Sequence, residues 1–295
     1  MQLSSKDLTL LSDQAIAAAE KAGALITERA GQSIPVQQKI GGDHLASQVV
    51  TEVDFLSQEI ILEVLNPTCV SYDLALLTEE ETDDKKRLEK DYFWCIDPLD
   101  GTLPFINSTP GYAVSIALVS RSGESQIGVI FDPVKQTLYS AVRGQGALRN
   151  SQSWHLPSTD GEEKNKLTMV CDPSSIEYIK DPQIMKAVEK IASDFDLAGV
   201  DIISQGGAAM NACWVIENYP ACYFKFPKPQ DGGGSLWDFA ATACLFHELG
   251  AIACDFQGQA LDLNRADSTF MNHRGVIFDA EPSRVEAIRA MYCGT

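Results

Sequence analysis

The stretch CIDPLDGTLPFI, residues 95–106, places two aspartates three positions apart at the end of an apolar run. The preceding segment, YFWCI at residues 92–96, is short, aromatic and apolar, as expected of a buried strand. Asp100 followed by Gly101 is ordinary turn chemistry, but Asp97 adds a second carboxylate that needs partners or a cation. Because side chains converge where a buried strand ends in a turn, we expect a functional site there.

Further carboxylates lie at the ends of other predicted strands and at the starts of predicted helices. Taken one at a time, each group has an ordinary structural explanation. The first is a solvated acidic loop, the second is a first-turn residue stabilised by the helix dipole, and the third is a helix-capping interaction. The residues in question are Glu79, Glu80 and Glu81 after a short apolar run, Asp238 beside Trp237, and Asp54 three positions after Thr51. The case for function therefore rests on their joint arrangement.

Convergence of Glu79, Asp97, Asp100 and Asp238 would place four carboxylates in a small space, which requires protonation or bound cations. A ligand set made only of oxygen, with no matching His or Cys, favours Mg²⁺ over Zn²⁺. Two or more such ions can polarise a phosphate and lower the pKa of an attacking water. The pattern outlines a phosphomonoesterase in which Asp54 and the Thr102 hydroxyl form a proton relay.

The composition narrows the choice of partner. The chain has 295 residues, is 45% hydrophobic, and carries 41 acidic against 23 basic residues, a formal net charge of -18. With no basic stripe, binding of a nucleic-acid polymer is disfavoured, and an anionic substrate would need cations at its site.

No run of about 18 apolar residues or secretion signal is present, so we expect no membrane association and a cytoplasmic location. The eight scattered cysteines are interpreted as reduced core residues.

Helical and strand-like patterns alternate along the chain. Helices are expected at residues 6–30, from residue 51 onward, and at 182–195, 208–218 and 235–250. The second is expected to present Phe55, Leu56, Ile60, Ile61, Val64 and Leu65 on one side. Strands are expected at 113–120, 125–132 and 137–144, and again at 166–171 and 197–204. This mixture favours a layered α/β (α+β) fold, with the polar stretch 149–166 dividing residues 1–152 from 153–295.

Three separate motifs, LLTEEE, IDPLDGT and GGGSLWDFAA, in this order, resemble the signatures of the inositol monophosphatase superfamily of Mg²⁺-dependent, lithium-sensitive phosphatases. VVTEVD, GGAAMNAC and HELGAIACDFQGQALDLN extend the resemblance over nearly the whole chain. It implies a layered αβαβα sandwich with the site between two halves, the first holding most metal ligands and the second supplying Asp238 and substrate contacts. It also implies two or three Mg²⁺ ions and a possible homodimer.

The resemblance assigns roles to particular residues. Metal binding falls to Glu79, Asp97, the Leu99 carbonyl, Asp100, Thr102 and Asp238, with Glu80 beside them. The catalytic residues are Asp54, Thr102 and Glu80, of which Asp54 and Thr102 activate the water. Phosphate or substrate contacts fall to Gly101, Thr102, Gly207 and Ala208. Lys39 and Asp43 are considered for a further metal, although a plain surface loop is the simpler interpretation of residues 39–51.

The resemblance implies that the substrate is a small phosphorylated metabolite. Lys225 helps to choose between two candidate substrates. The motifs resemble the 3'(2'),5'-bisphosphate nucleotidase branch slightly more than the inositol branch. Where inositol enzymes place an acidic residue that accepts hydroxyl hydrogen bonds, this chain has Lys225, which can hold a second phosphate instead. Lys225 and Lys228 could equally be surface residues. An inositol monophosphatase is the alternative.

Other classes are disfavoured on sequence grounds. HELGA at His247 lacks the second histidine of a zinc hydrolase motif, and no G-x-S-x-G nucleophile motif exists. A non-enzymatic regulator that binds metal or phosphate ligands on the same fold is a further alternative, because fold alone does not give activity. Such a protein should have lost one or more carboxylates, and all four are present.

Overall fold

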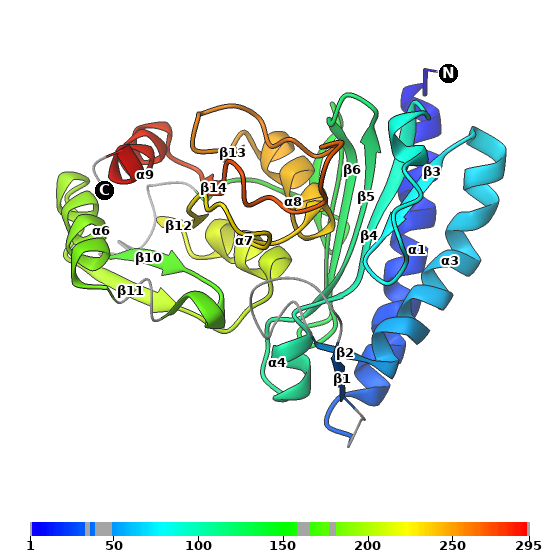
Figure 1. Ribbon diagram of the computed structural model, residues 1–295, viewed down its shortest axis with the longest axis horizontal. Coiled ribbons are helices and arrows are strands. Elements are labelled where there is room, and N and C mark those ends of the chain that lie inside the picture. The colour runs from blue at the N-terminus through cyan, green and yellow to red at the C-terminus, as the bar shows by residue number, and fades with distance from the viewer. Residues whose placement is uncertain (1, 33–35, 39–48, 158–165, 177–180, 294–295) are drawn as a thin grey trace.

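The molecule is built from five layers that alternate helices and sheets (Figure 1). The computed structural model describes residues 2–32, 36–38, 49–157, 166–176 and 181–293. Helices α1 (Ser5–Arg29) and α3 (Glu52–Tyr72) cover one face of a seven-stranded sheet, and α7 (Ala208–Glu217) and α8 (Leu236–Leu249) cover the other. A five-stranded sheet and the outer helices α6 (Pro182–Asp194) and α9 (Pro282–Cys293) complete the predicted αβαβα sandwich.

The seven-stranded sheet runs in the order β3-β4-β5-β6-β7-β8-β9 and is antiparallel except for the β3–β4 pair. Its central strands are apolar on both faces because helices cover both. On β4, Phe93 and Cys95 pack toward α7 and α8, whereas Trp94 and Ile96 pack toward α1 and α3. The strands are β3 (Ala75–Thr78), β4 (Tyr92–Asp100), β5 (Ala113–Ser120), β6 (Ser125–Asp132), β7 (Thr137–Val142), β8 (Gly146–Arg149) and β9 (Gln152–Trp154).

The smaller sheet has the order β11-β10-β12-β14-β13, and β10 pairs in parallel with both of its neighbours. Its strands are β10 (Leu167–Val170), β11 (Val200–Ile203), β12 (Ala221–Lys225), β13 (Ile252–Cys254) and β14 (Val276–Asp279). A separate pair joins β1 (Val36–Gln38) to β2 (Val49–Thr51), and short helical turns form at η1 (Lys86–Leu88), α4 (Thr102–Ile106) and η2 (Pro173–Ser175). The strand β9 lies inside the stretch predicted as a boundary between halves.

The two N-terminal helices begin at residues that cap them, as the sequence suggests. Ser4 and Asp7 form a capping box at α1, and Thr51 and Asp54 form one at α3. The predicted apolar face of α3 is confirmed for Ile61 and Leu65, which are buried, and wrong for Phe55, which is 40% exposed. The buried stripe runs through Val53, Ser57, Ile61 and Leu65 at intervals of four and faces α1 and β4, and the helix continues through Pro67 to Tyr72.

Other sequence expectations are confirmed where the structure describes them. The cysteines with described side chains are free thiols, six of them buried and Cys69 half-buried. Within the described ranges, no helix is long and apolar enough to cross a membrane. Residues 39–48, which include Lys39 and Asp43, lie outside the described residues.

Candidate metal centre and substrate cleft

A bulge in β4 brings Asp97 and Asp100 to the same side of the sheet. In a regular strand, residues three apart point to opposite faces. Here Asp97 pairs with Ser115 and Asp100 with Ala113, so three steps along β4 match two along β5. The extra residue reverses the alternation and turns both carboxylates the same way. The DPLD sequence therefore forms a pair of ligands because of this irregularity in the strand.

Asp238 completes the carboxylate cluster from the other side of the cleft. It lies in the first turn of α8, where its Oδ2 accepts the Ser235 N–H at 2.7 Å, closing the helix N-terminus. The Ser115 hydroxyl donates to the Trp237 carbonyl at 3.0 Å and ties this end of α8 to β5. As a result, one carboxylate oxygen from each of Asp97, Asp100 and Asp238 lies within 4.8 Å of the other two.

The carboxylates repel one another in a place with little water. Burial and the charges of Glu79, Asp100 and Asp238 raise the pKa of Asp97 well above its ordinary value. Burial and Asp238 likewise raise the pKa of Asp100. For Asp238, burial raises the pKa to about 6 even though the Lys225 ammonium opposes the shift. These shifts show that negative charge is costly here unless a cation is present.

The residues present fit a hard divalent cation. The donors are carboxylate oxygens with the Leu99 backbone carbonyl nearby, and no His or Cys side chain belongs to the group of ligands found in the described ranges. Mg²⁺ prefers such oxygen ligands, and its charge would remove the repulsion that raises the pKa values. Glu79 contacts this group through Asp97, and its N–H bonds to the Ile96 carbonyl at 3.1 Å.

Asp54 and Thr102 lie within hydrogen-bond reach, as the relay requires. The Thr102 hydroxyl lies 3.1 Å from Asp54 Oδ1 and 3.3 Å from the Leu99 carbonyl oxygen. The other Asp54 oxygen accepts the N–H and the hydroxyl of Thr51 at 2.8 and 2.6 Å. Asp54 thus caps α3 and contacts Thr102 at the same time, so the capping interpretation is confirmed and the proton relay stays a prediction. Both side chains are buried.

Two glycines allow the backbone to close around the cluster. Gly101 has φ +84°, a left-handed conformation that favours glycine, and caps α4. A methyl group at Gly207 would lie 2.5 Å from Asp100 Oδ2, so only glycine fits against that carboxylate. The N–H groups of Ala208 and Ala209 donate to the two Asp100 oxygens at 3.1 and 2.8 Å, which places Asp100 at the N-terminus of α7.

The predicted substrate contacts of Gly207 and Ala208 remain predictions. The Gly207 N–H donates to the Gly111 carbonyl at 2.7 Å, and the Ala208 N–H donates to Asp100. Both groups are therefore engaged within the protein, and a contact with substrate would use other atoms of these residues. Glu80 is half-buried beside Glu79 and has interactions of its own.

A buried arginine, which sequence reasoning missed, fixes the loop that carries Glu79. The Arg87 side chain is fully buried; its Nε donates to Asp83 Oδ2 at 2.9 Å, and Nη2 lies 2.8 Å from the same oxygen in an ion pair. The same guanidinium donates to Asn264 Oδ1 at 2.6 Å, and Asn264 Nδ2 donates back to the Arg87 carbonyl at 3.2 Å. The acidic loop is thereby joined to the segment that follows β13.

Lys225 is a largely buried residue rather than a surface one. Its ammonium lies 2.7 Å from Asp172 Oδ2 and 5.6 Å from the centre of the Phe239 ring, and its side chain is 16% exposed. The other Asp172 oxygen accepts from Asn211 at 2.9 Å and from Tyr223 at 3.0 Å. Asp172 is a second residue that sequence reasoning missed, although it follows a buried strand just as Asp97 does.

Lys225 is held positively charged by its surroundings. Burial alone would lower its pKa, but the carboxylates of Asp172, Asp238 and Asp100 together raise it. The lysine therefore places a positive charge at the edge of the carboxylate cluster, where Asp238 feels it. One of its three N–H donors is used by Asp172, which leaves donors for an anionic ligand.

The layered arrangement of helices and sheets is a fold of the inositol monophosphatase type. The chain belongs to the inositol monophosphatase family, whose model matches residues 7–290. A Haemophilus influenzae relative, named Nus factor SuhB, is 31% identical over 92% of this chain and 91% of its own length.

Solved structures show the same fold. Extragenic suppressor protein suhB from Bartonella henselae has a TM-score of 0.69 and 24% identity, covering 97% of this chain and 100% of its own. SaIMPase-II has been solved with inositol monophosphate (TM-score 0.66, 18% identity, 96% and 94% coverage). It has also been solved with 2'AMP (TM-score 0.67, 20% identity, 94% and 92% coverage).

Proposed function

We propose that the protein is a Mg²⁺-dependent phosphomonoesterase that removes the 3'(2')-phosphate of 3'(2'),5'-bisphosphate nucleotides. The observation that carries the phosphatase assignment is the convergence of Asp97, Asp100 and Asp238 within 4.8 Å, beside the Asp54–Thr102 pair. Membership of the inositol monophosphatase family supports it. Two buried carboxylates and one half-buried carboxylate, all of raised pKa, have no structural need for one another, whereas a metal-dependent hydrolase needs them all.

The chain's own residues provide the positioning and the proton path. Mg²⁺ held by Glu79, Asp97, Asp100, Asp238 and the Leu99 carbonyl would supply the positive charge that polarises the phosphate and the water. The Thr102 hydroxyl donates to Asp54, so its oxygen can accept a hydrogen bond from the attacking water. As the water oxygen bonds to phosphorus, the bond between phosphorus and the ester oxygen breaks. One water proton passes to Thr102 Oγ1 while the Thr102 proton passes to Asp54 Oδ1, and the leaving ester oxygen takes up a proton from solvent water to become the hydroxyl of the product.

The charge of Lys225 supports a substrate with two phosphates. A single phosphate would be neutralised by the cations at the carboxylate cluster, whereas a second phosphate needs its own positive partner. Lys225 is protonated, largely buried and close enough to the cluster for its charge to oppose the rise in the pKa of Asp238 that burial causes. SaIMPase-II, a protein of the same fold, has been solved with a nucleotide, 2'AMP, which is compatible with a nucleotide in this cleft.

Two other functions have specific support. An inositol monophosphatase is favoured by the family name and by the inositol monophosphate bound to SaIMPase-II. A regulatory role without turnover is favoured by the Nus factor name of the relative that is 31% identical. The retained carboxylates argue against loss of catalysis, since a protein that only bound a partner would not need them.

The deciding experiment compares phosphate release from adenosine 3',5'-bisphosphate and from inositol 1-phosphate in Mg²⁺, with and without chelator. We expect chelator-sensitive release that favours the nucleotide and that lithium inhibits. Preference for the inositol ester would keep the mechanism and reject the substrate. Absence of release from both esters would reject the enzymatic proposal for these two branches.

A matched control separates the site from general effects of charge. Asp201→Asn removes a carboxylate from an exposed pair with Lys166 and should leave turnover unchanged. Asp97→Asn removes one from the cluster and should abolish turnover. Equal activity of the two variants would show that the cluster is not the catalytic centre.

A further inference from the structure

Asp172 and Lys225 form a largely buried ion pair at the edge of the carboxylate cluster. The Lys225 ammonium lies 2.7 Å from Asp172 Oδ2, and the two side chains are 16% and 12% exposed for lysine and aspartate. The ammonium also lies 5.6 Å from the centre of the Phe239 ring, and Phe239 directly follows Asp238 in the first turn of α8. The ion pair therefore lies beside the helix end that carries one of the candidate metal ligands.

Asp172 is fixed in place by neutral donors from two other elements. Its Oδ1 accepts hydrogen bonds from Asn211 Nδ2 on α7 at 2.9 Å and from the Tyr223 hydroxyl on β12 at 3.0 Å. Both donors belong to fully buried side chains. Its Oδ2 contacts Lys225 and also lies 3.5 Å from the Ser175 hydroxyl. The segment after β10 thus presents this carboxylate to the lysine in one fixed orientation.

The lysine has other carboxylates within electrostatic reach. Burial would lower the pKa of Lys225, but three carboxylates raise it overall, Asp172 most strongly and then Asp238 and Asp100. The ammonium in turn opposes the rise in the pKa of Asp238 that burial causes. Within the described ranges, Asp172 is the carboxylate that forms an ion pair with Lys225. Because a buried charge without a partner is costly, an ammonium released by Asp172 would move to the carboxylate cluster.

An ammonium inside the carboxylate cluster would compete with a metal ion for the same oxygens. Mg²⁺ binds such a site through the negative charge of its ligands. If the Lys225 ammonium bonded to Asp238 or Asp100, Mg²⁺ would have to displace it. We infer that Asp172 is a positioning residue that holds the Lys225 ammonium out of the metal site and so leaves the cluster available to Mg²⁺. This inference rests on the metal centre of the proposed function, and it concerns neither the substrate nor the chemical step.

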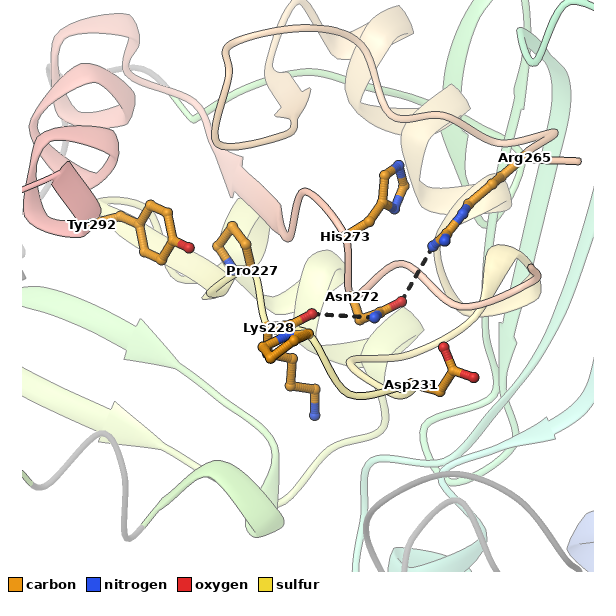
Figure 2. A pocket seen from close by; sticks show the side chains of 8 residues that line it. Pro227, Lys228, Asp231, Arg265, Asn272, His273 and Tyr292 are labelled. Carbon is orange, nitrogen blue, oxygen red and sulfur yellow. Dashed lines mark hydrogen bonds between the residues drawn. The ribbon is translucent and has the colours of Figure 1, made fainter. Parts of the chain in front are cut away.

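A second lysine, three residues further along the chain, provides a contrast. Lys228 lines a separate polar cavity of about 370 Å³, together with residues that include Arg265, Asn272 and His273 (Figure 2). Its carbonyl accepts a hydrogen bond from Asn272 Nδ2 at 3.2 Å, and its N–H donates to the Asn272 carbonyl at 2.9 Å. Lys228 carries the same charge as Lys225 but lines a different cavity, so its replacement serves as a matched control.

The test is a double-mutant cycle in which Mg²⁺ binding is measured by titration calorimetry without substrate. Asp172→Asn keeps an acceptor oxygen for Asn211 and Tyr223 but removes the charge that holds the lysine. We expect it to weaken Mg²⁺ binding about tenfold when Lys225 is present. In a Lys225→Met background, the same substitution should weaken Mg²⁺ binding only about twofold, because the negative charge is lost but no ammonium is left to enter the cluster.

Two controls separate positioning from general effects of charge and folding. In a Lys228→Met background, Asp172→Asn should still weaken Mg²⁺ binding about tenfold, because Lys225 is still present. Asp172→Glu, which keeps the negative charge, should weaken it much less than Asp172→Asn does. Circular dichroism checks the fold of each variant, and Asp172→Ser replaces Asp172→Asn in the cycle if the asparagine variant does not fold.

Two outcomes would overturn this inference alone. Equal Mg²⁺ affinities of wild type and Asp172→Asn would show that Asp172 does not keep the ammonium out of the metal site. An equal loss of affinity with and without Lys225→Met would show that Asp172 acts on the metal through its charge and not through the lysine. Absence of saturable Mg²⁺ binding by the wild type would instead overturn the metal centre, and the proposed function with it.

Discussion

Replacing Asp97 with asparagine should stabilise the metal-free protein at alkaline pH although it removes activity. Asp97 is buried beside Glu79, Asp100 and Asp238, and its Oδ1 accepts the Leu99 N–H at 3.0 Å. Asparagine keeps that acceptor, and its amide group can donate to a neighbouring carboxylate instead of repelling it. The variant therefore resembles the protonated form of Asp97 at every pH.

The size of the effect follows from the pKa shifts. A carboxyl group whose pKa is higher in the folded than in the unfolded chain binds more protons when folded. The free energy of unfolding therefore falls as the pH rises between the two values. For Asp238, the rise from 3.8 to about 6 corresponds to about 3 kcal/mol, and its partial exposure reduces this to about 2 kcal/mol. The pKa of Asp97 is raised in the same direction.

The assay is urea unfolding of wild type and Asp97→Asn in chelator at pH 4.5 and pH 8, followed by tryptophan fluorescence. We expect the variant to gain stability relative to wild type as the pH rises from 4.5 to 8, because only the wild type has to ionise Asp97 beside the other carboxylates. Distant groups such as Asp279, whose pKa burial raises to about 6, cancel in the difference. Added Mg²⁺ should stabilise the wild type only. A variant less stable than wild type by the same amount at both pH values would refute the repulsion argument.

Three further predictions concern single side chains. Thr102→Val should lower kcat by about a hundredfold while leaving Mg²⁺ affinity within a few-fold, measured by initial rates and titration calorimetry; unchanged kcat would remove Thr102 from the relay. Lys225→Met should raise KM for a bisphosphate about tenfold more than KM for a monophosphate. The control Lys225→Arg, which keeps the positive charge, should retain the preference for the bisphosphate. Equal effects on the two KM values would show that Lys225 does not contact the second phosphate. Arg87→Leu should raise the Mg²⁺ concentration for half-maximal activity, because the Glu79 loop loses its bonds to Asp83 and Asn264; a fall in kcat that added Mg²⁺ does not restore would contradict this.

Much of the fold could be predicted because local signals agree with tertiary structure. The alanine-rich first helix, the meander β5–β7 and α8 ending at Gly250 appear where the sequence indicates. The prediction failed in part for α3, where the spacing of apolar residues is compatible with more than one buried face of the helix. The buried stripe of α3 depends on its contacts with α1 and β4, which the periodicity of α3 does not contain.

The candidate site was predictable to a different extent for each residue. Asp97 and Asp100 could be paired from the motif, but the bulge that turns them to the same side depends on pairing with β5. Asp172 carries the same signal as Asp97, a carboxylate just after a buried strand, and could have been found. The role of Arg87 could not have been found, because its partner Asn264 lies far away in the sequence.

The most direct test of the central claim is the Mg²⁺ dependence of phosphate release by Asp100→Asn, with adenosine 3',5'-bisphosphate as substrate. Asp100 is held by the N–H groups of α7 and lies within 4.8 Å of the two other carboxylates. We expect Mg²⁺-dependent turnover by wild type and a loss of more than about a hundredfold in the variant, with unchanged circular dichroism. Turnover close to that of wild type in a natively folded Asp100→Asn would contradict the metal-dependent mechanism.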